Sequence, residues 1–310
     1  MPRRCAPPPR RRDAGFTLIE LMVTLVITLL VLMAGLSFYL MSRSSYVTID
    51  DNANLEERGN FAISIMTRLM RQTAYVPVVS DTGGMLSVTS AMLTGLDNCS
   101  TPNDSETLSC GPGTAVNGSD AVMIRYYGIG KSETQRNVPD GSVIDCSGQG
   151  VAGSTSNDTA DTERGLSMLF IANGASGKPS LMCKYRARAA NGVEGTTFVT
   201  QELVPGVETM QLLYGVTTNG DDVPDKYVTA DGMAATDWIN VKTVKIALVV
   251  RADNLSADAG TPATISLFGP LYSGDNATYT PTVDTKSLRK LYYATVQIRN
   301  YQSCGDPSCQ

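Results

Sequence analysis

One uninterrupted apolar run dominates the hydrophobic pattern of this chain. Almost every residue in Phe16–Met41 is apolar, and no charged residue lies between Glu20 and Arg43. The uncharged stretch Leu21–Met41 has the length that an α-helix needs to cross a bilayer. Five arginines lie in the segment before it, which predicts a cytoplasmic N-terminus by the positive-inside rule. We therefore expect one membrane-spanning helix over residues 16–41.

The helical pattern continues beyond this apolar run. No proline occurs between Phe16 and Val76, and good helix formers fill most of residues 42–76. The apolar residues that recur there at helical spacing are Leu55, Phe61, Ile65 and Leu69. We expect an amphipathic continuation over residues 42–76, ordered to about Tyr75 and ended by Pro77, with Gly35 and Gly59 as soft points. The apolar stripe is expected to pack under the protein's own sheet.

The period of the pattern changes to that of β-strands after about residue 85. Short β-type runs occur at residues 121–127, 166–172, 181–186, 207–216, 244–250 and 291–299. In Val244–Val250 and Leu291–Arg299, apolar and polar residues alternate, as in antiparallel strands with one buried face. Asn219–Gly220 predicts a hairpin turn because both residues tolerate positive φ. The pattern predicts an α+β fold, in which residues 77–310 form a β-rich globular head.

Seven cysteines are placed unevenly along the chain. Cys5 lies in the arginine-rich segment, whereas the other six follow the apolar run: Cys99, Cys110, Cys146, Cys183, Cys304 and Cys309. An even set in Gly- and Ser-rich loops indicates disulfides formed in an oxidising compartment such as the periplasm. Six cysteines allow 15 connectivities. Proximity in sequence favours Cys99–Cys110 and Cys304–Cys309, which leaves Cys146–Cys183 as the third pair. Residues 97–164, where three of these cysteines lie, are expected to form long, disulfide-tethered loops with one strand.

Charge and composition argue against several function classes. The formal net charge is −5, and it becomes more negative without the arginine-rich leader, which disfavours nucleic-acid binding. The chain has no histidine, so Ser-His-Asp and Cys-His catalysis are excluded, and we expect neither an enzyme nor a cofactor. The acidic turn with Asp221, Asp222 and Asp225 is a weak calcium candidate, because it lacks the residue order of an EF-hand loop. A polar hairpin tip without metal is the preferred interpretation.

The junction Gly15–Glu20 is the most specific feature of the chain. It places a carboxylate five residues into the apolar run, where it costs about 3 kcal/mol on membrane-insertion scales. An ordinary membrane anchor has no use for such a group. Two simpler alternatives are a carboxylate at the headgroup boundary and an ordinary secretory signal, although no convincing small-x-small cleavage site follows the apolar stretch.

This junction resembles the class III signal of type IV pilins and type II secretion pseudopilins. The matching residues are Arg10–Gly15 followed by Phe-Thr-Leu-Ile-Glu20 and a long apolar helix. The resemblance implies that a prepilin peptidase removes residues 1–15 by cleavage after Gly15 and methylates the new N-terminal Phe16. It also implies that Glu20 pairs with the N-terminal amine of a neighbouring subunit during filament assembly. Such a pair keeps a buried carboxylate charged.

A less specific resemblance extends to PilW-type minor pilins. It rests on Leu55–Ala62 with Arg68–Arg71, on Met210–Gly215 with Asp221–Tyr227, and on Val244–Arg251 with Leu288–Asn300. The resemblance implies a long helix packed on an antiparallel sheet and a low-copy subunit near the filament tip. A J-type pseudopilin of type II secretion, or a filament-displayed adhesin module with its long loops as the binding surface, are the alternatives. A third alternative is a bitopic membrane enzyme unrelated to pili, which would keep an intact N-terminus.

The resemblance also implies a location and partners. The precursor would span the bacterial inner membrane once, with its head in the periplasm, and would later reach the pilus and the cell surface. Its partners would be the prepilin peptidase, the pilus assembly platform, other minor pilins, the major pilin and a tip adhesin.

Overall fold

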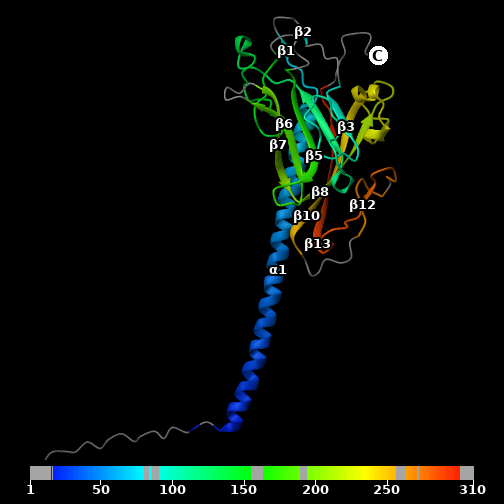
Figure 1. The fold of residues 1–310 in the computed structure, drawn as a ribbon. Coiled ribbons are helices and arrows are strands. Elements are labelled where there is room, and N and C mark those ends of the chain that lie inside the picture. Colours follow the sequence, from blue (N-terminus) through cyan, green and yellow to red (C-terminus); the bar gives the residue numbers. More distant parts are fainter. Residues whose placement is uncertain are drawn as a thin grey trace, which may run out of the picture. The chain divides into compact units, whose positions relative to one another are not determined.

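The computed structural model describes Gly15 and residues 17–79, 84–85, 91–154, 163–188, 194–255, 263–270 and 272–300 (Figure 1). Contacts within the chain divide it into two units, Met1–Asp50 and Asp51–Gln310. One long helix, α1, spans Leu18–Gln72, and the strands all belong to the second unit. Phe16, expected as the first residue of the mature chain, and Cys304 and Cys309 lie outside the described residues.

The first half of α1 consists of a helix with apolar side chains on all sides. The large side chains from Leu18 to Met41 are mostly exposed, with Leu18 at 79% and Phe38 at 75% of their accessible surface. The hydroxyls of Thr24 and Thr28 donate hydrogen bonds to the carbonyl oxygens of Leu21 (3.0 Å) and Thr24 (2.7 Å). These bonds satisfy the polar groups within the helix itself, as a lipid environment requires. By length and composition, this helix is able to cross a membrane.

The second half of α1 has one buried face. Its buried residues are Asp51, Leu55, Gly59, Ala62, Ile65, Met66, Leu69 and Met70. Phe61, expected in the apolar stripe, is instead 53% exposed. The reason is angular: Phe61 lies six residues after Leu55, which at 100° per residue places it about 240° around the helix. Ala62, seven residues after Leu55, occupies the buried position that was expected for Phe61.

The helix ends at Gln72, slightly before the expected Tyr75. Ala74 adopts a left-handed conformation with φ of 59° and donates its backbone N–H to the carbonyl of Arg125. A residue in this conformation stops α-helical propagation. The helix is therefore ended by a bond to the sheet before the chain reaches Pro77.

A five-stranded antiparallel sheet has the order β3-β4-β5-β6-β7. Its strands are β3 (Leu93–Leu96), β4 (Ala121–Tyr126), β5 (Gly165–Asn173), β6 (Pro179–Arg188) and β7 (Glu194–Pro205). Within the described part of residues 97–164, β4 is the one strand, as the sequence predicted. β3 and β7 were not predicted.

A four-stranded antiparallel sheet has the order β13-β10-β8-β9. Its strands are β8 (Val207–Val216), β9 (Lys226–Val228), β10 (Val241–Leu255) and β13 (Ser287–Gln297). β8 and β9 form the predicted hairpin. Gly220 in the connection has φ of 80°, whereas Asn219, expected to share a positive φ, does not adopt one. Two short pairs, β1 (Val78–Val79) with β2 (Gly84–Met85) and β11 (Ile265–Ser266) with β12 (Thr278–Tyr279), complete the strands.

The 3-10 helices are short and lie in the connections between strands. They span Val116–Gly118, Glu133–Gln135, Ala230–Gly232 and Ala235–Asn240. Trp238 in the last of them stacks edge-on against Tyr214 of β8, with the ring centroids 4.8 Å apart.

One hydrophobic core joins both sheets to the second half of α1. It contains side chains from α1, such as Met66 and Leu69, together with Leu169 of β5, Leu212 of β8 and Ile246 of β10. Asp120 connects the sheets: its N–H donates to the carbonyl of Met210, and its carboxylate accepts the N–H of Leu212 at 2.7 Å. The fold is therefore the expected α+β arrangement, a long N-terminal helix packed on antiparallel sheets.

The expected alternation of buried and exposed positions holds for β13 but only in part for β10. From Ile246 to Ala252 every residue of β10 is buried. Ala247 and Val249, on the face away from α1, pack against Leu267 and Ile265 in the segment that carries β11. A second covering layer, which periodicity alone does not reveal, buries the face that was expected to contact solvent.

Candidate functional site

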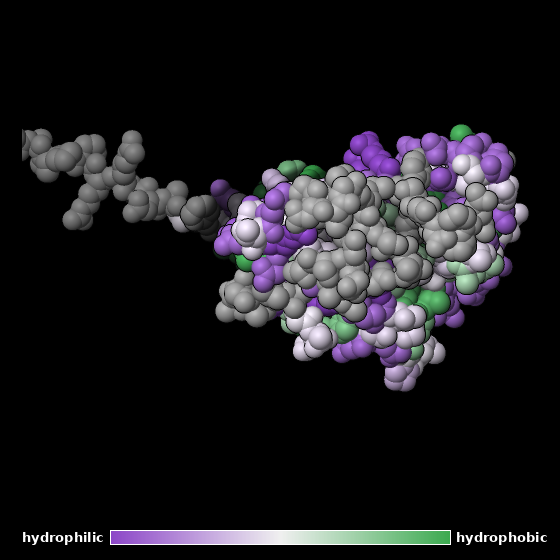
Figure 2. Space-filling view, turned by 90° about the horizontal axis from the view of Figure 1, so that it is seen from above, coloured by the Kyte–Doolittle hydropathy of each residue, from purple (hydrophilic) through white to green (hydrophobic). Residues whose placement is uncertain are grey.

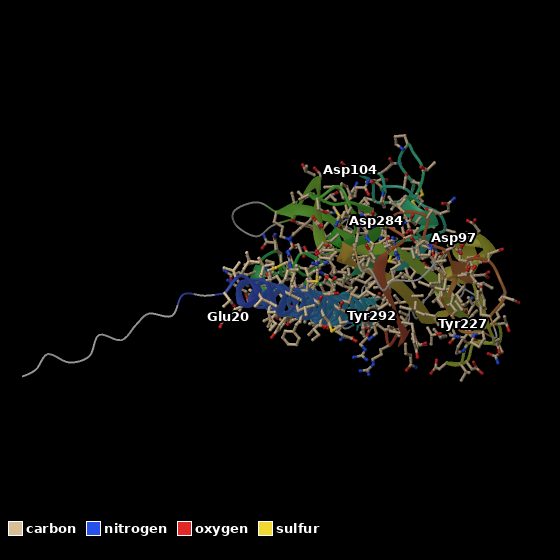
Figure 3. All side chains as sticks on the ribbon, turned by 90° about the horizontal axis from the view of Figure 1, so that it is seen from below. Glu20, Asp97, Asp104, Tyr227, Asp284 and Tyr292 are labelled. Atoms are coloured by element: carbon tan, nitrogen blue, oxygen red, sulfur yellow. A yellow bond between two sulfur atoms is a disulfide. The ribbon has the colours of Figure 1, made fainter. Side chains whose placement is uncertain are left out.

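The predicted processing and assembly segment lies at the start of α1. Gly15 and Thr17 are exposed, and Glu20 lies in the first turn of the helix (Figure 3). The backbone N–H of Glu20 donates to Thr17 Oγ1 at 3.3 Å, which is the bond of an N-terminal capping residue. A carboxylate in the first turn also interacts favourably with the helix dipole. Glu20 and its peptide group are thus compatible with a regular helix that starts two residues after the expected cleavage position.

The surface that follows Glu20 is mostly apolar and carries no charged residue over Leu21–Met41. Leu21, Leu30 and Leu40 each expose more than half of their accessible surface, although they are among the most apolar residue types. Exposed apolar patches of this size mark a membrane or protein interaction site. The segment therefore combines an apolar, all-round exposed helix with one carboxylate at its N-terminal end.

The second half of α1, from Asp51 to Gln72, is attached to the four-stranded sheet through Tyr292. Tyr292 of β13 is 7% exposed, and its hydroxyl donates to the carbonyl of Leu55 at 2.8 Å (Figure 3). Its ring passes so close to Gly59 that a Cβ at this position would lie 2.2 Å from two ring atoms. Gly59 is therefore a close-approach position rather than the soft point that the sequence suggested.

Ion pairs and hydrogen bonds flank this contact on both sides. Lys290 pairs with Glu56, and this hydrogen bond lowers the pKa of the Glu56 carboxyl. Arg58 bonds Asp253 at 2.5 Å, which likewise lowers the pKa of that carboxyl. Burial, with Glu56 nearby, raises the pKa of Tyr292 to about 12. The second half of α1 is thus attached to the sheet by three contacts: the Tyr292 ring packed against Gly59, the Glu56–Lys290 ion pair and the Arg58–Asp253 ion pair.

Two disulfides stabilise the loops of the head. Cys99 bonds Cys110 and Cys146 bonds Cys183, with Cα–Cα distances of 5.4 Å and 5.9 Å. The first is a pair that proximity in sequence favoured, and the second is the pair that remained after it.

The loop closed by Cys99–Cys110 lies on the outer face of the five-stranded sheet. Asp104 bonds Lys184 at 2.7 Å, and Glu106 pairs with both Arg186 and Arg125. Burial, together with the nearby cation of Arg164, lowers the pKa of the Arg125 guanidinium to about 10. The acidic side chains of this loop are therefore directed to the sheet, where they neutralise buried cations.

The acidic turn after β8 is held by hydrogen bonds within itself. Asp225 accepts the N–H and the hydroxyl of Thr218 at 2.6 Å and 2.7 Å, which lowers the pKa of its carboxyl. Asp221 accepts the N–H of Val223 at 3.0 Å, and Asp222 lies 3.5 Å from Lys242. Throughout the described residues, no group of three or more Asp, Glu, Cys or His side chains is arranged to hold a metal ion.

Comparisons with known proteins match two separate parts of the chain. A family described as the prokaryotic N-terminal methylation motif matches residues 10–36, which include the Gly15–Glu20 junction. A family described as Type IV Pilus-assembly protein W matches residues 168–300, from within β5 to the end of the described chain. No curated protein sequence matches the chain.

Among solved structures, a type IV-like pilin, TTHA1219 from Thermus thermophilus, is similar over 79% of this chain and 96% of that chain. The identity is 12% and the TM-score 0.40. The two family matches confirm the resemblance inferred from the sequence: the chain is similar to type IV pilin-like proteins at its N-terminus and to PilW-type minor pilins over residues 168–300.

Proposed function

We propose that this chain is a minor pilin, a non-enzymatic subunit that helps to initiate a type IV pilus and lies at its tip. The observation that carries the proposal is the carboxylate of Glu20 at the head of an exposed apolar helix, directly after the Gly15–Phe16 junction. The match of residues 168–300 to the pilus-assembly family supports a pilus rather than a secretion filament.

The proposed life cycle follows from the chemistry of the N-terminal segment. The precursor is held in the bacterial inner membrane by residues 16–41, with the head in the periplasm, where its disulfides are stable. A prepilin peptidase cuts after Gly15 and methylates Phe16. The mature subunit then exchanges lipid contacts for contacts with other minor pilins and the major pilin at the assembly platform.

Glu20 would favour the move from lipid to filament by forming an ion pair with a neighbouring subunit. A carboxylate in an apolar environment pays a desolvation cost, and a cation at hydrogen-bond distance recovers much of it. The amine of a neighbouring subunit's processed N-terminus is a cation that appears only after cleavage. Pairing with Glu20 would make incorporation depend on processing.

The test replaces Glu20 by Ala and by Gln in the full chain. Both variants should be processed and folded, yet their amount in sheared filaments should fall at least tenfold relative to the membrane pool. Glu57→Ala is the matched control, because Glu57 is exposed on the same helix and lies outside the apolar run. Wild-type incorporation of Glu20→Gln would contradict the role of the charge.

A deletion strain separates the pilus from the secretion filament. We expect loss of surface pili and of pilus-dependent motility, with type II secretion intact. Normal piliation together with failed secretion would refute the pilus assignment.

A further inference from the structure

The two larger sheets have four edge strands, and three of them are protected. β3 and β9 are short, with four and three residues. β13 is longer but carries Arg289 and Lys290, both of which form ion pairs. Short length and charged side chains are the common means by which proteins prevent strand addition at an edge.

β7 has none of these protections over most of its length. It has 12 residues, and the seven from Gly195 to Gln201, Gly-Thr-Thr-Phe-Val-Thr-Gln, contain no charge and no proline. Thr, Val and Phe are residues with high β propensity. All seven except Phe198 are exposed, and Val199 exposes 37% of its accessible surface.

The outer edge of β7 is also open in terms of backbone bonding. β7 pairs with β6 on one side, and the strand order of the sheet leaves no strand on the other side among the described residues (Figure 1). In an antiparallel strand, alternate residues direct their N–H and C=O groups away from the partner, so this run offers about three or four such residues. Phe198 packs against the cluster with Leu108 and Met168, which holds the edge in place.

The charges at the ends of this run indicate the kind of occupant. Self-pairing with a second copy, antiparallel and centred on Phe198, would place Glu194 opposite Glu202, and like charges directly opposite are unfavourable. The carboxylate of Glu202 accepts hydrogen bonds from the Ser180 hydroxyl (2.7 Å) and the Ala175 N–H (3.1 Å), and because both donors are neutral its charge is not compensated by them. A strand with basic residues at both ends and an uncharged, β-branched middle therefore complements the edge better than a second copy does. A run of seven residues corresponds to a strand about 23 Å long.

We propose that β7 is an acceptor edge for an extended strand of a different polypeptide, with an uncharged β-branched middle and basic ends. Main-chain hydrogen bonds supply most of the affinity in such strand addition, and alternate side chains supply selectivity. The inference is independent of the filament role, since it rests on the sheet alone.

The probe is a fluorescent nonapeptide that alternates Thr and Val over seven residues and has Lys at both ends. With the purified full-length protein in detergent, anisotropy should show saturable binding, and amide exchange over residues 195–201 should slow at least tenfold. Val199→Lys should weaken binding at least tenfold. Val223→Lys, the same change at another exposed valine (65% exposed) in the turn after β8, should leave binding unchanged.

Two further peptides separate strand addition from simple adhesion. The same peptide with alternate backbone amides N-methylated on one edge should not bind, and the peptide with Glu at both ends should bind at least fivefold more weakly. The proposal is overturned if the Lys-flanked peptide does not saturate, if N-methylation has no effect, or if Val199→Lys binds as the unchanged protein does. A dimer of the protein that Val199→Lys dissociates would assign the edge to a second copy and overturn the proposed occupant.

Discussion

Replacing Gly59 by Ala tests how the second half of α1 is attached to the sheet. In an ordinary helix interior, Gly→Ala stabilises by about 1 kcal/mol, because alanine restricts the unfolded chain and has a higher helix propensity. Here the added Cβ would lie 2.2 Å from the ring of Tyr292, which is buried and bonded to the carbonyl of Leu55. Overpacking of this kind costs about 1–3 kcal/mol. We therefore expect Gly59→Ala to leave stability unchanged or lower it by up to about 2 kcal/mol.

The sign should reverse when the ring is absent. Tyr292→Ala alone should cost about 3–5 kcal/mol, as for other buried aromatic side chains. In that background the space beside Gly59 is empty, so Gly59→Ala should stabilise by about 1 kcal/mol. Gly35→Ala is the control, because a Cβ at Gly35 meets no atom within 4 Å.

Urea unfolding of the detergent-solubilised protein measures these free energies. The chain has one tryptophan, Trp238, which packs on Tyr214 in the head and reports loss of tertiary structure by fluorescence. The reasoning is refuted if Gly59→Ala stabilises by the same amount with and without the Tyr292 ring. Such a result would mean that the helix can move away from β13 at no cost.

Three further changes in the globular head should alter the free energy of unfolding. Glu208→Gln should destabilise by about 3–5 kcal/mol in urea unfolding, because Arg289 would keep a buried charge without its carboxylate and Arg251 would retain only Asp284, at 2.7 Å. Burial raises the pKa of Asp120 well above its usual value, so wild-type stability should fall as the pH rises above about 4, and Asp120→Asn should flatten that dependence in unfolding measured from pH 4 to 8. Removing the Cys146–Cys183 disulfide, which spans 37 residues, should lower the free energy of unfolding by about 4 kcal/mol in the chain-entropy model, and an unchanged urea midpoint would contradict it.

Local signals in the sequence were sufficient for the helix and most long strands. The apolar run and the absence of proline predicted α1, and Asn219–Gly220 predicted the β8–β9 hairpin. The Gly15–Glu20 junction identified the candidate site because its charge placement has no use in an ordinary anchor. These features depend on neighbours in sequence, so periodicity and motif spacing reveal them.

Features that depend on distant segments were not predicted. The role of Gly59 is set by Tyr292, more than 200 residues away, and a lone glycine in a helix does not name its partner. β7 was missed because its exposed Thr-rich run lacks the apolar alternation used to identify strands. The single connected core, with Asp120 bridging β4 and β8, results from tertiary packing that local patterns do not encode.

Mass spectrometry of the N-terminus of the protein purified from its native membrane tests the central claim most directly. The account predicts that the mature chain begins at N-methylated Phe16 and that residues 1–15 are absent. A chain that still carries the arginine-rich leader would contradict it, because Glu20 would then have no processed neighbouring terminus to meet.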